Sequence, residues 1–154
     1  MQHASRKKTR KFLLQKLYAR IYGNVDEQKF FDSYFDGIMD FQADTAYMQE
    51  MFDTIVSHQK EILFIIEKYA PKFDIETMLK TNILALCIAI AEMLYLKEEI
   101  PAKVSINEAI ELSKYFWDES SKNVVNGILN SFYEHIEEYQ KADTKSLSTH
   151  HFFL

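Results

Sequence analysis

Glycine and proline are scarce in this sequence, which has three glycines and two prolines among 154 residues. Sandwiches and barrels of β-strands need many turns that are rich in these two residues. Their scarcity, together with long stretches of helical periodicity, predicts an all-α fold. A chain of this length can bury one hydrophobic core, so we expect a single compact bundle of about six to seven helices.

Cysteine is nearly absent too: Cys87 is the only one, so no internal disulfide can form. A lone cysteine inside an apolar run suits a reducing cytosol, and we expect it to be a small buried side chain. The sequence holds no phosphate-binding glycine loop, no HExxH motif and no paired-cysteine motif. No serine or cysteine nucleophile has a base in a recognisable place. We therefore predict a protein that is not an enzyme and that uses no metal and no cofactor.

A hydrophobic run long enough to span a bilayer is also lacking. Residues 83–96 are apolar except for Glu92, but this run of fourteen residues is too short to cross a membrane. At the amino terminus, Lys16 and Arg20 interrupt the apolar residues that follow the basic segment, unlike in a signal peptide. We expect a cytoplasmic protein without a membrane span, in which residues 83–96 form the central core helix.

Apolar residues at helical spacing predict six helices, at residues 5–22, 26–41, 44–69 and 75–97 and from Ser105 and Ser120 or Ser121 onward. The pair Ala70-Pro71 ends the third, because the residue before proline is disfavoured in a helix. Ser105 and Glu108 are expected to form a capping box at the start of the fifth. Residues 1–140 are predicted to form one domain and residues 141–154 a polar, flexible tail.

Charge is distributed unevenly along the chain. Residues 1–22 carry seven Lys and Arg and no acidic residue, whereas the other 132 residues hold eleven basic and 23 acidic side chains. A basic cluster on an acidic body is typical of a site for a polyanion such as a nucleic acid. A solvated basic terminus is the alternative that charge alone leaves open.

The most informative segment is residues 100–130, IPAKVSINEAIELSKYFWDESSKNVVNGILN. Taken by itself it predicts a helical hairpin. Gly127 lies inside the second helix, where glycine costs about 1 kcal/mol relative to alanine. We expect a neighbouring backbone that packs closely against Gly127 to offset this cost.

This segment resembles the carboxy-terminal signature of the NusB family of transcription antitermination factors. The shared pattern is a proline, K-V-x-I-N-E-A-I-E-L, an aromatic residue, an acidic-serine turn and V-N-G-I-L. Near the other end, SRKKTRKFLLQKLY resembles the Arg-rich first helix of the same family. The two matches stand in the family's order and spacing.

The resemblance implies a bacterial cytoplasmic protein with a NusB-like bundle that pairs with NusE, a small-subunit ribosomal protein. The pair binds boxA-type single-stranded RNA and helps to assemble the antitermination complex on RNA polymerase during ribosomal RNA transcription. The resemblance leaves open whether the chain forms a homodimer when NusE is absent. Some RNA cytosine methyltransferases begin with a similar domain, but this chain ends before a methyltransferase domain could start. The alternative function is a helical protein-interaction adaptor without specific RNA binding, whose basic arm meets an acidic partner.

The resemblance also assigns residues. Its basic arm corresponds to Arg6, Lys7, Lys8 and Arg10, and its RNA-contacting tyrosine to Tyr18, for which a core position is the alternative. The turn from Glu119 to Lys122 corresponds to a second RNA-contacting region, with Ser120, Ser121 and Lys122 at the start of a helix. Free N–H groups there would favour a phosphate. Glu92 corresponds to an acidic residue on the surface that binds NusE.

The sequence departs from the family pattern at several positions. Trp117 stands where the family usually has glycine, and Asn123-Val124 replaces a lysine-phenylalanine pair. Cys87 and Ala91 replace an arginine and a tyrosine of the core helix. We expect Trp117 to be partly exposed beside acidic and serine residues, where its indole can stack on an RNA base.

Overall fold

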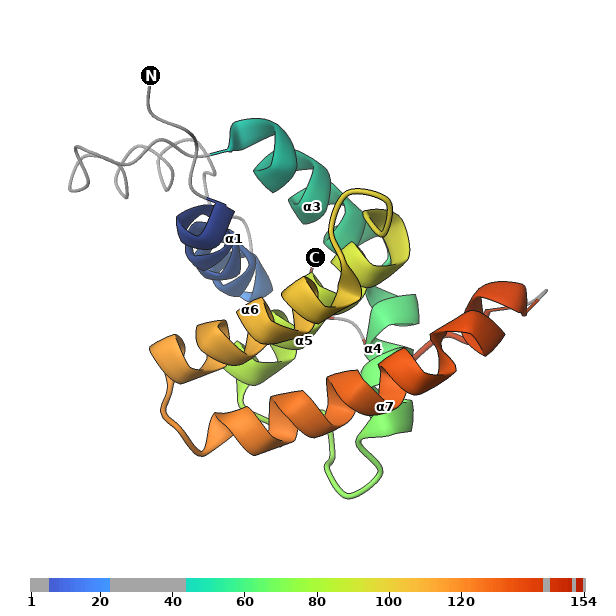
Figure 1. Ribbon diagram of the computed structural model, residues 1–154. Coiled ribbons are helices and arrows are strands. Elements are labelled where there is room, and N and C mark those ends of the chain that lie inside the picture. The colour runs from blue at the N-terminus through green and yellow to red at the C-terminus, as the bar shows by residue number, and fades with distance from the viewer. Residues whose placement is uncertain (1–5, 23–43, 143–144, 151, 154) are drawn as a thin grey trace, which may run out of the picture.

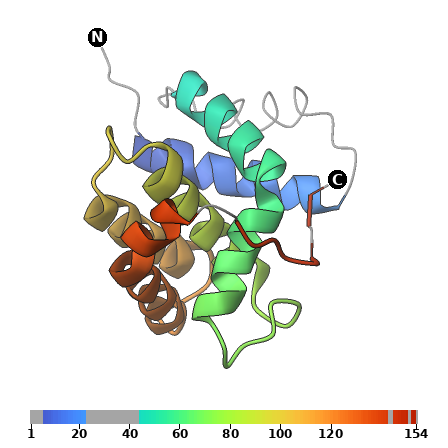
Figure 2. The ribbon, with the colours of Figure 1, turned by 90° about the vertical axis from the view of Figure 1, so that its right-hand side faces the viewer.

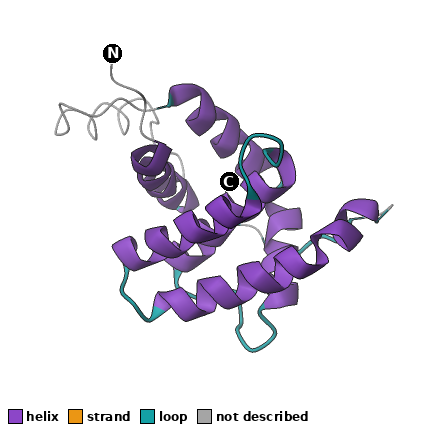
Figure 3. Ribbon diagram, viewed as in Figure 1, coloured by secondary structure: helices purple, strands orange, loops and turns teal. Residues whose placement is uncertain are grey.

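The structure is a computed structural model that describes residues 6–22, 44–142, 145–150 and 152–153. Six α-helices and no strand occur within these ranges (Figures 1 and 3). The helices are α1 (Arg6–Ile21), α3 (Thr45–Ser57), α4 (Gln59–Tyr69), α5 (Lys80–Tyr95), α6 (Ala102–Phe116) and α7 (Ser121–Lys141). The predicted all-α class is confirmed. The helix predicted at residues 26–41 lies outside the described residues.

Helix α5 is the centre of the bundle, as predicted for residues 83–96. Every residue from Asn82 to Met93 is buried, and each of the other five described helices packs against α5 (Figure 2). A helix that is apolar on all sides has no face to leave in water, which explains its central place. It begins at Lys80, later than predicted, because residues 71–78 form turns and bends. Cys87 is buried as expected, and burial raises the pKa of its thiol to about 12.

Helices α6 and α7 form the predicted hairpin, but neither uses the predicted serine cap. Helix α6 begins directly after Pro101, so Ser105 lies inside the helix rather than before it. Its hydroxyl donates a hydrogen bond to Glu92, with 2.8 Å between the oxygens. Helix α7 begins at Ser121, yet the hydroxyl of Ser120 donates to the carboxylate of Asp118 instead of capping the helix.

The prediction of one continuous helix at residues 44–69 is wrong, because the chain bends at His58 between α3 and α4. His58 has φ −108° and ψ 22°. The Ser57 hydroxyl donates to the Asp53 carbonyl at 2.6 Å, and the Gln59 amide donates to the Val56 carbonyl at 3.1 Å. Side chains that bind helix carbonyls compete with the backbone ladder, which favours a break at this point.

The described residues beyond α7 pack against α4 (Figure 2). The Ser148 N–H donates to the Lys60 carbonyl at 2.9 Å. The Gln59 side chain accepts from the N–H groups of Phe152 and Phe153 at 2.8 and 2.9 Å and donates to the Phe153 carbonyl at 2.9 Å. Phe153 is 2% exposed. This packing was not expected for the polar, flexible tail predicted at residues 141–154.

Candidate nucleic-acid interface

Helix α1 presents two different sides. Leu13, Leu14 and Leu17 are buried, and Arg10 lies three, four and seven residues before them, on the same side of the helix. Arg10 is accordingly only 4% exposed. Lys7, Lys8 and Tyr18 are exposed. The basic arm predicted from the sequence is therefore divided between the interior and the surface.

The buried side of α1 closes a polar cluster around Glu92, which is 0% exposed. Arg10 donates to both carboxylate oxygens of Glu92, from Nε at 2.8 Å and from Nη2 at 3.1 Å. The hydroxyls of Ser105 and Tyr47 donate to the same carboxylate. Burial raises the pKa of Tyr47 far above its ordinary value, and the carboxylate of Glu92 raises it further. Tyr47 therefore stays protonated, so its hydroxyl remains a donor.

This Glu92 cluster (Arg10, Tyr47, Glu92 and Ser105) joins α1, α3, α5 and α6. It corrects two predictions. Arg10 cannot contact an RNA phosphate from the interior, and Glu92 has no exposed surface to offer to a partner protein. The partner that a buried carboxylate requires is supplied inside the fold.

Arg6 lies at the edge between the two sides of α1. Its Nη2 is 2.8 Å from Asp44 Oδ2, and this hydrogen bond is the main reason why the pKa of Asp44 lies below its ordinary value. The guanidinium also lies over the Tyr47 ring, 4.7 Å from the ring centroid. The Arg6 side chain remains 37% exposed. Arg6 therefore binds the residue that caps α3, and its side chain is only partly exposed.

A groove of about 500 Å³ lies between α1 and the end of α6. We call it the aromatic groove; its lining residues are Leu14, Gln15, Tyr18, Ala19, Thr81, Tyr115, Phe116 and Trp117. Three of these rings are well exposed: Tyr18 at 40%, Tyr115 at 62% and Trp117 at 56%. The fold thus brings Tyr18 and Trp117 together across the sequence. The predicted exposure of Trp117 is confirmed, and the alternative of a core position for Tyr18 is wrong.

One lysine of α1 contacts a ring that lines the aromatic groove. The Lys11 ammonium is 3.9 Å from the centroid of the Tyr115 ring, and Lys7 and Lys11 line a smaller hollow that also includes Tyr115. Glu108 and Glu111 also line this hollow. Both carboxylates are near cations, because Glu108 is 4.0 Å from Arg10 and Glu111 is 3.7 Å from Lys114. Lys11 and Tyr115 were not among the predicted site residues, although the aromatic run 115–117 was a signal.

Three N–H groups at the start of α7 already have partners in the turn before the helix. The Ser120 N–H donates to the Asp118 carboxylate at 2.9 Å. The N–H groups of Ser121 and Lys122 donate to the carbonyls of Asp118 and Glu119, each at 3.2 Å. Ser121 is 2% exposed, so its predicted contact with RNA is wrong. Ser120 and Lys122 are exposed.

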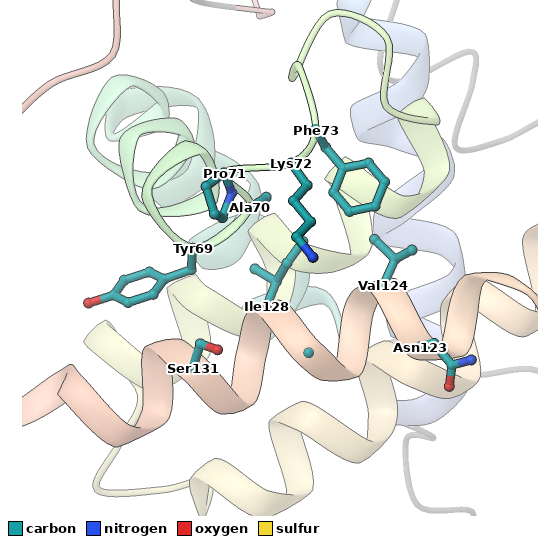
Figure 4. Close-up of a pocket in the computed structure, with 10 residues that line it drawn as sticks. Tyr69, Ala70, Pro71, Lys72, Phe73, Asn123, Val124, Ile128 and Ser131 are labelled. Carbon is teal, nitrogen blue, oxygen red and sulfur yellow. The ribbon is translucent and has the colours of Figure 1, made fainter.

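A second hollow, of about 400 Å³, lies between the loop after α4 and the side of α7 (Figure 4). Figure 4 shows Phe73, Val124 and Ile128 on its walls. Gly127 lies in the same lining, and nothing lies within 4 Å of the position that its Cβ would take. The expectation of a closely packed backbone against Gly127 is therefore wrong.

Across the described ranges, no group of three or more His, Cys, Asp or Glu side chains is arranged to hold a metal ion. None of the described helices combines the length and the apolar character needed to cross a membrane.

Comparison with known proteins adds the family. The model of the NusB family matches residues 7–134. Transcription antitermination protein NusB of Clostridium perfringens (strain SM101) is 32% identical over 135 residues, which cover 86% of this chain and 99% of that protein. The protein of the same name from Alkaliphilus oremlandii is 30% identical over 131 residues, or 84% of this chain and 94% of the relative.

Solved structures have the same fold. The solution structure of NusB from Aquifex aeolicus matches with a TM-score of 0.70 at 25% identity, over 94% of this chain and 98% of that one. A chain in the crystal structure of antitermination factors NusB and NusE in complex with double-stranded RNA matches with a TM-score of 0.69 at 27% identity. That match covers 84% of this chain and 96% of the other.

Proposed function

Because this chain belongs to the NusB family, we propose that it is a transcription antitermination factor that binds boxA-type single-stranded RNA together with NusE. In this role it helps to assemble the antitermination complex on RNA polymerase during ribosomal RNA transcription, in the bacterial cytoplasm. It acts by binding and catalyses no reaction. We assign the binding to a domain of residues 1–140.

The observation that carries this proposal is the position of Tyr18 and Trp117 in one groove, on the helix whose first turn carries the exposed Lys7 and Lys8. Lysines neutralise phosphates, and exposed aromatic rings stack on bases. A paired A-form helix keeps its bases stacked inside, so the exposed rings favour a single strand. The proposed RNA contacts are Arg6, Lys7, Lys8, Tyr18, Trp117, Ser120 and Lys122.

The basic arm can be tested through the salt dependence of binding. In the double variant Lys7→Ala/Lys8→Ala, the slope of log K against log salt should flatten by about 0.7 for each phosphate that the protein no longer neutralises. The measurement is a fluorescence-anisotropy titration of labelled boxA-like RNA at several salt concentrations, with and without NusE.

A matched control is Lys68→Ala/Lys141→Ala, which removes two exposed lysines from the ends of α4 and α7 (Figure 1). Its slope should equal that of the unaltered protein. An equal slope in the Lys7→Ala/Lys8→Ala variant would remove the arm from the RNA site. Equal affinity for boxA-like and scrambled RNA would favour the alternative, a protein-interaction adaptor without specific RNA binding.

A further inference from the structure

A short segment beyond α7 lies across α4 (Figure 2). We call its residues 147–150 and 152–153 the strap. The strap lies outside residues 7–134, the part of the chain that the NusB family model matches. Membership of the family therefore does not assign a role to the strap, and its contacts have to indicate one.

Two side chains of α4 hold the strap. The Gln59 amide binds the backbone of Phe152 and Phe153 through three hydrogen bonds. The Ser148 hydroxyl donates to the carboxylate of Glu67. Ser148 is 5% exposed and Phe153 is 2% exposed. Because the strap is anchored near both of its ends, it takes a defined position on the surface of the bundle.

The strap also engages a cation at the start of α5. The ammonium of Lys80, the first residue of α5, lies 4.9 Å from the centroid of the Phe152 ring. The face of an aromatic ring attracts a cation at this distance. The strap therefore occupies the positive charge of Lys80.

Lys80 lies beside the aromatic groove. Thr81, the next residue along α5, lines the groove together with Tyr18. A hydrogen bond with Tyr22 raises the pKa of the Tyr18 hydroxyl, and the positive charge of Lys80 partly opposes this rise. Such an effect weakens with distance, so the ammonium lies close to this end of the groove. Lys80 is thus placed to meet a phosphate, but the strap already engages its charge.

The contact between the strap and Lys80 can be exchanged for a phosphate. Residues 147–153 include no Asp or Glu, so the strap offers Lys80 an aromatic ring instead of a carboxylate. A ring attracts an ammonium less strongly than a phosphate does. The strap is part of the same chain, however, so it competes at the high effective concentration of a tethered ligand.

We propose that the strap is an intramolecular competitor of RNA, which holds Lys80 against Phe152 and so withholds one cation of the groove from the RNA phosphates. When the strap leaves α4, Lys80 becomes an additional phosphate contact. This inference rests on the proposed function, because it describes the regulation of the RNA surface. RNA also binds while the strap is in place, with one phosphate contact fewer.

Two variants release Lys80. Phe152→Leu removes the ring, and a shortened chain that ends at Ser146 lacks the strap but keeps Lys145. Neither variant removes a Lys, Arg, Asp or Glu, and the titrations are run at pH 8, where histidine is largely neutral. For single-stranded boxA-like RNA, the slope of log K against log salt should steepen by about 0.7, the contribution of one phosphate contact. The affinity should rise by about 2- to 5-fold, the ratio that corresponds to one exposed cation–π contact.

Lys80→Ala tests whether Lys80 is the cation that the strap withholds. In the shortened chain, this change should flatten the slope by about 0.7. In the full chain it should leave the slope unchanged, because the strap already withholds the ammonium.

Gln59→Ala tests the anchor of the strap without touching the aromatic groove. It should steepen the slope of the full chain and leave that of the shortened chain unchanged. The matched control is Gln49→Ala on α3, which removes an amide that donates to the exposed Asp53 and should alter neither slope. Circular dichroism checks the fold of every variant, and if the shortened chain does not fold, Phe152→Leu and Gln59→Ala decide.

Several results would overturn the role of the strap and leave the proposed function standing. One is an unchanged slope in both Phe152→Leu and Gln59→Ala. Another is an equal effect of Lys80→Ala on the full and the shortened chain, or no effect on either, while both chains bind boxA-like RNA. Absence of RNA binding in the unaltered protein and in every variant, with or without NusE, overturns the proposed function as well.

Discussion

The Glu92 cluster and the aromatic groove both use α1 and α6, and in both a basic residue of α1 lies over a tyrosine ring, Arg10 over Tyr47 and Lys11 over Tyr115. In the cluster, the carboxylate of Glu92 accepts from Arg10, Tyr47 and Ser105, so each of these polar groups has its partner inside the fold. In the groove, Trp117 and its neighbouring rings remain exposed. The direction in which a side chain leaves its helix, rather than its chemical type, therefore decides whether it is buried or remains at the surface.

Arg10 and Lys11 make the same point within one turn of α1. The guanidinium of Arg10 is buried and held by two hydrogen bonds to Glu92. The ammonium of Lys11 lies at the rim of the groove over Tyr115. Substitutions in the cluster, at the rim and outside both sites test how sharply the two sites are separated.

The largest effect is expected from Glu92→Ala. This change leaves the charge of Arg10 buried without a partner, which typically costs about 3–5 kcal/mol. For a domain of this size, such a loss lowers the thermal midpoint by roughly 6–20 °C. The measurement is thermal and denaturant unfolding followed by circular dichroism.

Glu99→Ala removes an exposed carboxylate just beyond the end of α5 and serves as the control, with an expected change within about 0.5 kcal/mol. The double variant Arg10→Met/Glu92→Leu should recover part of the lost stability, because it removes both charges together. An unchanged midpoint in Glu92→Ala, combined with weaker NusE association, would instead return Glu92 to the partner surface.

A smaller effect is expected from Arg10→Lys, which keeps the charge but loses the two-pronged interaction with Glu92. We expect about 1–3 kcal/mol lower stability, because the ammonium cannot reproduce both hydrogen bonds. The salt slope of RNA binding should not change.

The opposite pattern is expected from Lys11→Ala. This variant should flatten the salt slope of RNA binding by about 0.7 and have little effect on the free energy of unfolding. A flatter slope in Arg10→Lys would contradict the separation of the two sites.

The smallest effect is expected from Gly127→Ala on α7, which belongs to neither site. Alanine should raise the stability by about 0.5–1 kcal/mol, because the helix gains propensity and the new Cβ meets no neighbour. The midpoint of denaturant unfolding gives the value, and RNA binding should remain as in the unaltered protein. A loss of stability would show that the space beside Gly127 is filled.

Helical periodicity predicted most of the fold because most helices have a clear apolar stripe. The boundaries of α1 and the apolar core of α5 follow directly from it. The break at His58 was missed because the apolar pattern continues through it, while the side chains of Ser57 and Gln59 take up helix carbonyls. The predicted cap at Ser105 was wrong, because α6 already begins after Pro101 and the Ser105 hydroxyl donates to Glu92 on another helix.

The candidate site was harder to predict because it depends on pairs of residues far apart in the sequence. The burial of Arg10 had a local signal, its helical phase with the buried leucines of α1, and this signal was overlooked. Its pairing with Glu92, 82 residues later, had none. Likewise, nothing near Tyr18 in the sequence indicates that Tyr115 and Trp117 line the same groove.

The distance between Arg10 and Glu92 along the chain also matters while the protein is being made. The two residues are separated by 82 positions, and a ribosome that adds about 5–20 residues per second takes roughly 4–16 s to go from one codon to the other. During this interval Glu92 has not yet been added to the chain, so the guanidinium of Arg10 stays hydrated. The side of α1 that carries Arg10 can therefore complete its contacts only after α5 has been made, although α1 also packs against α3, which is made earlier.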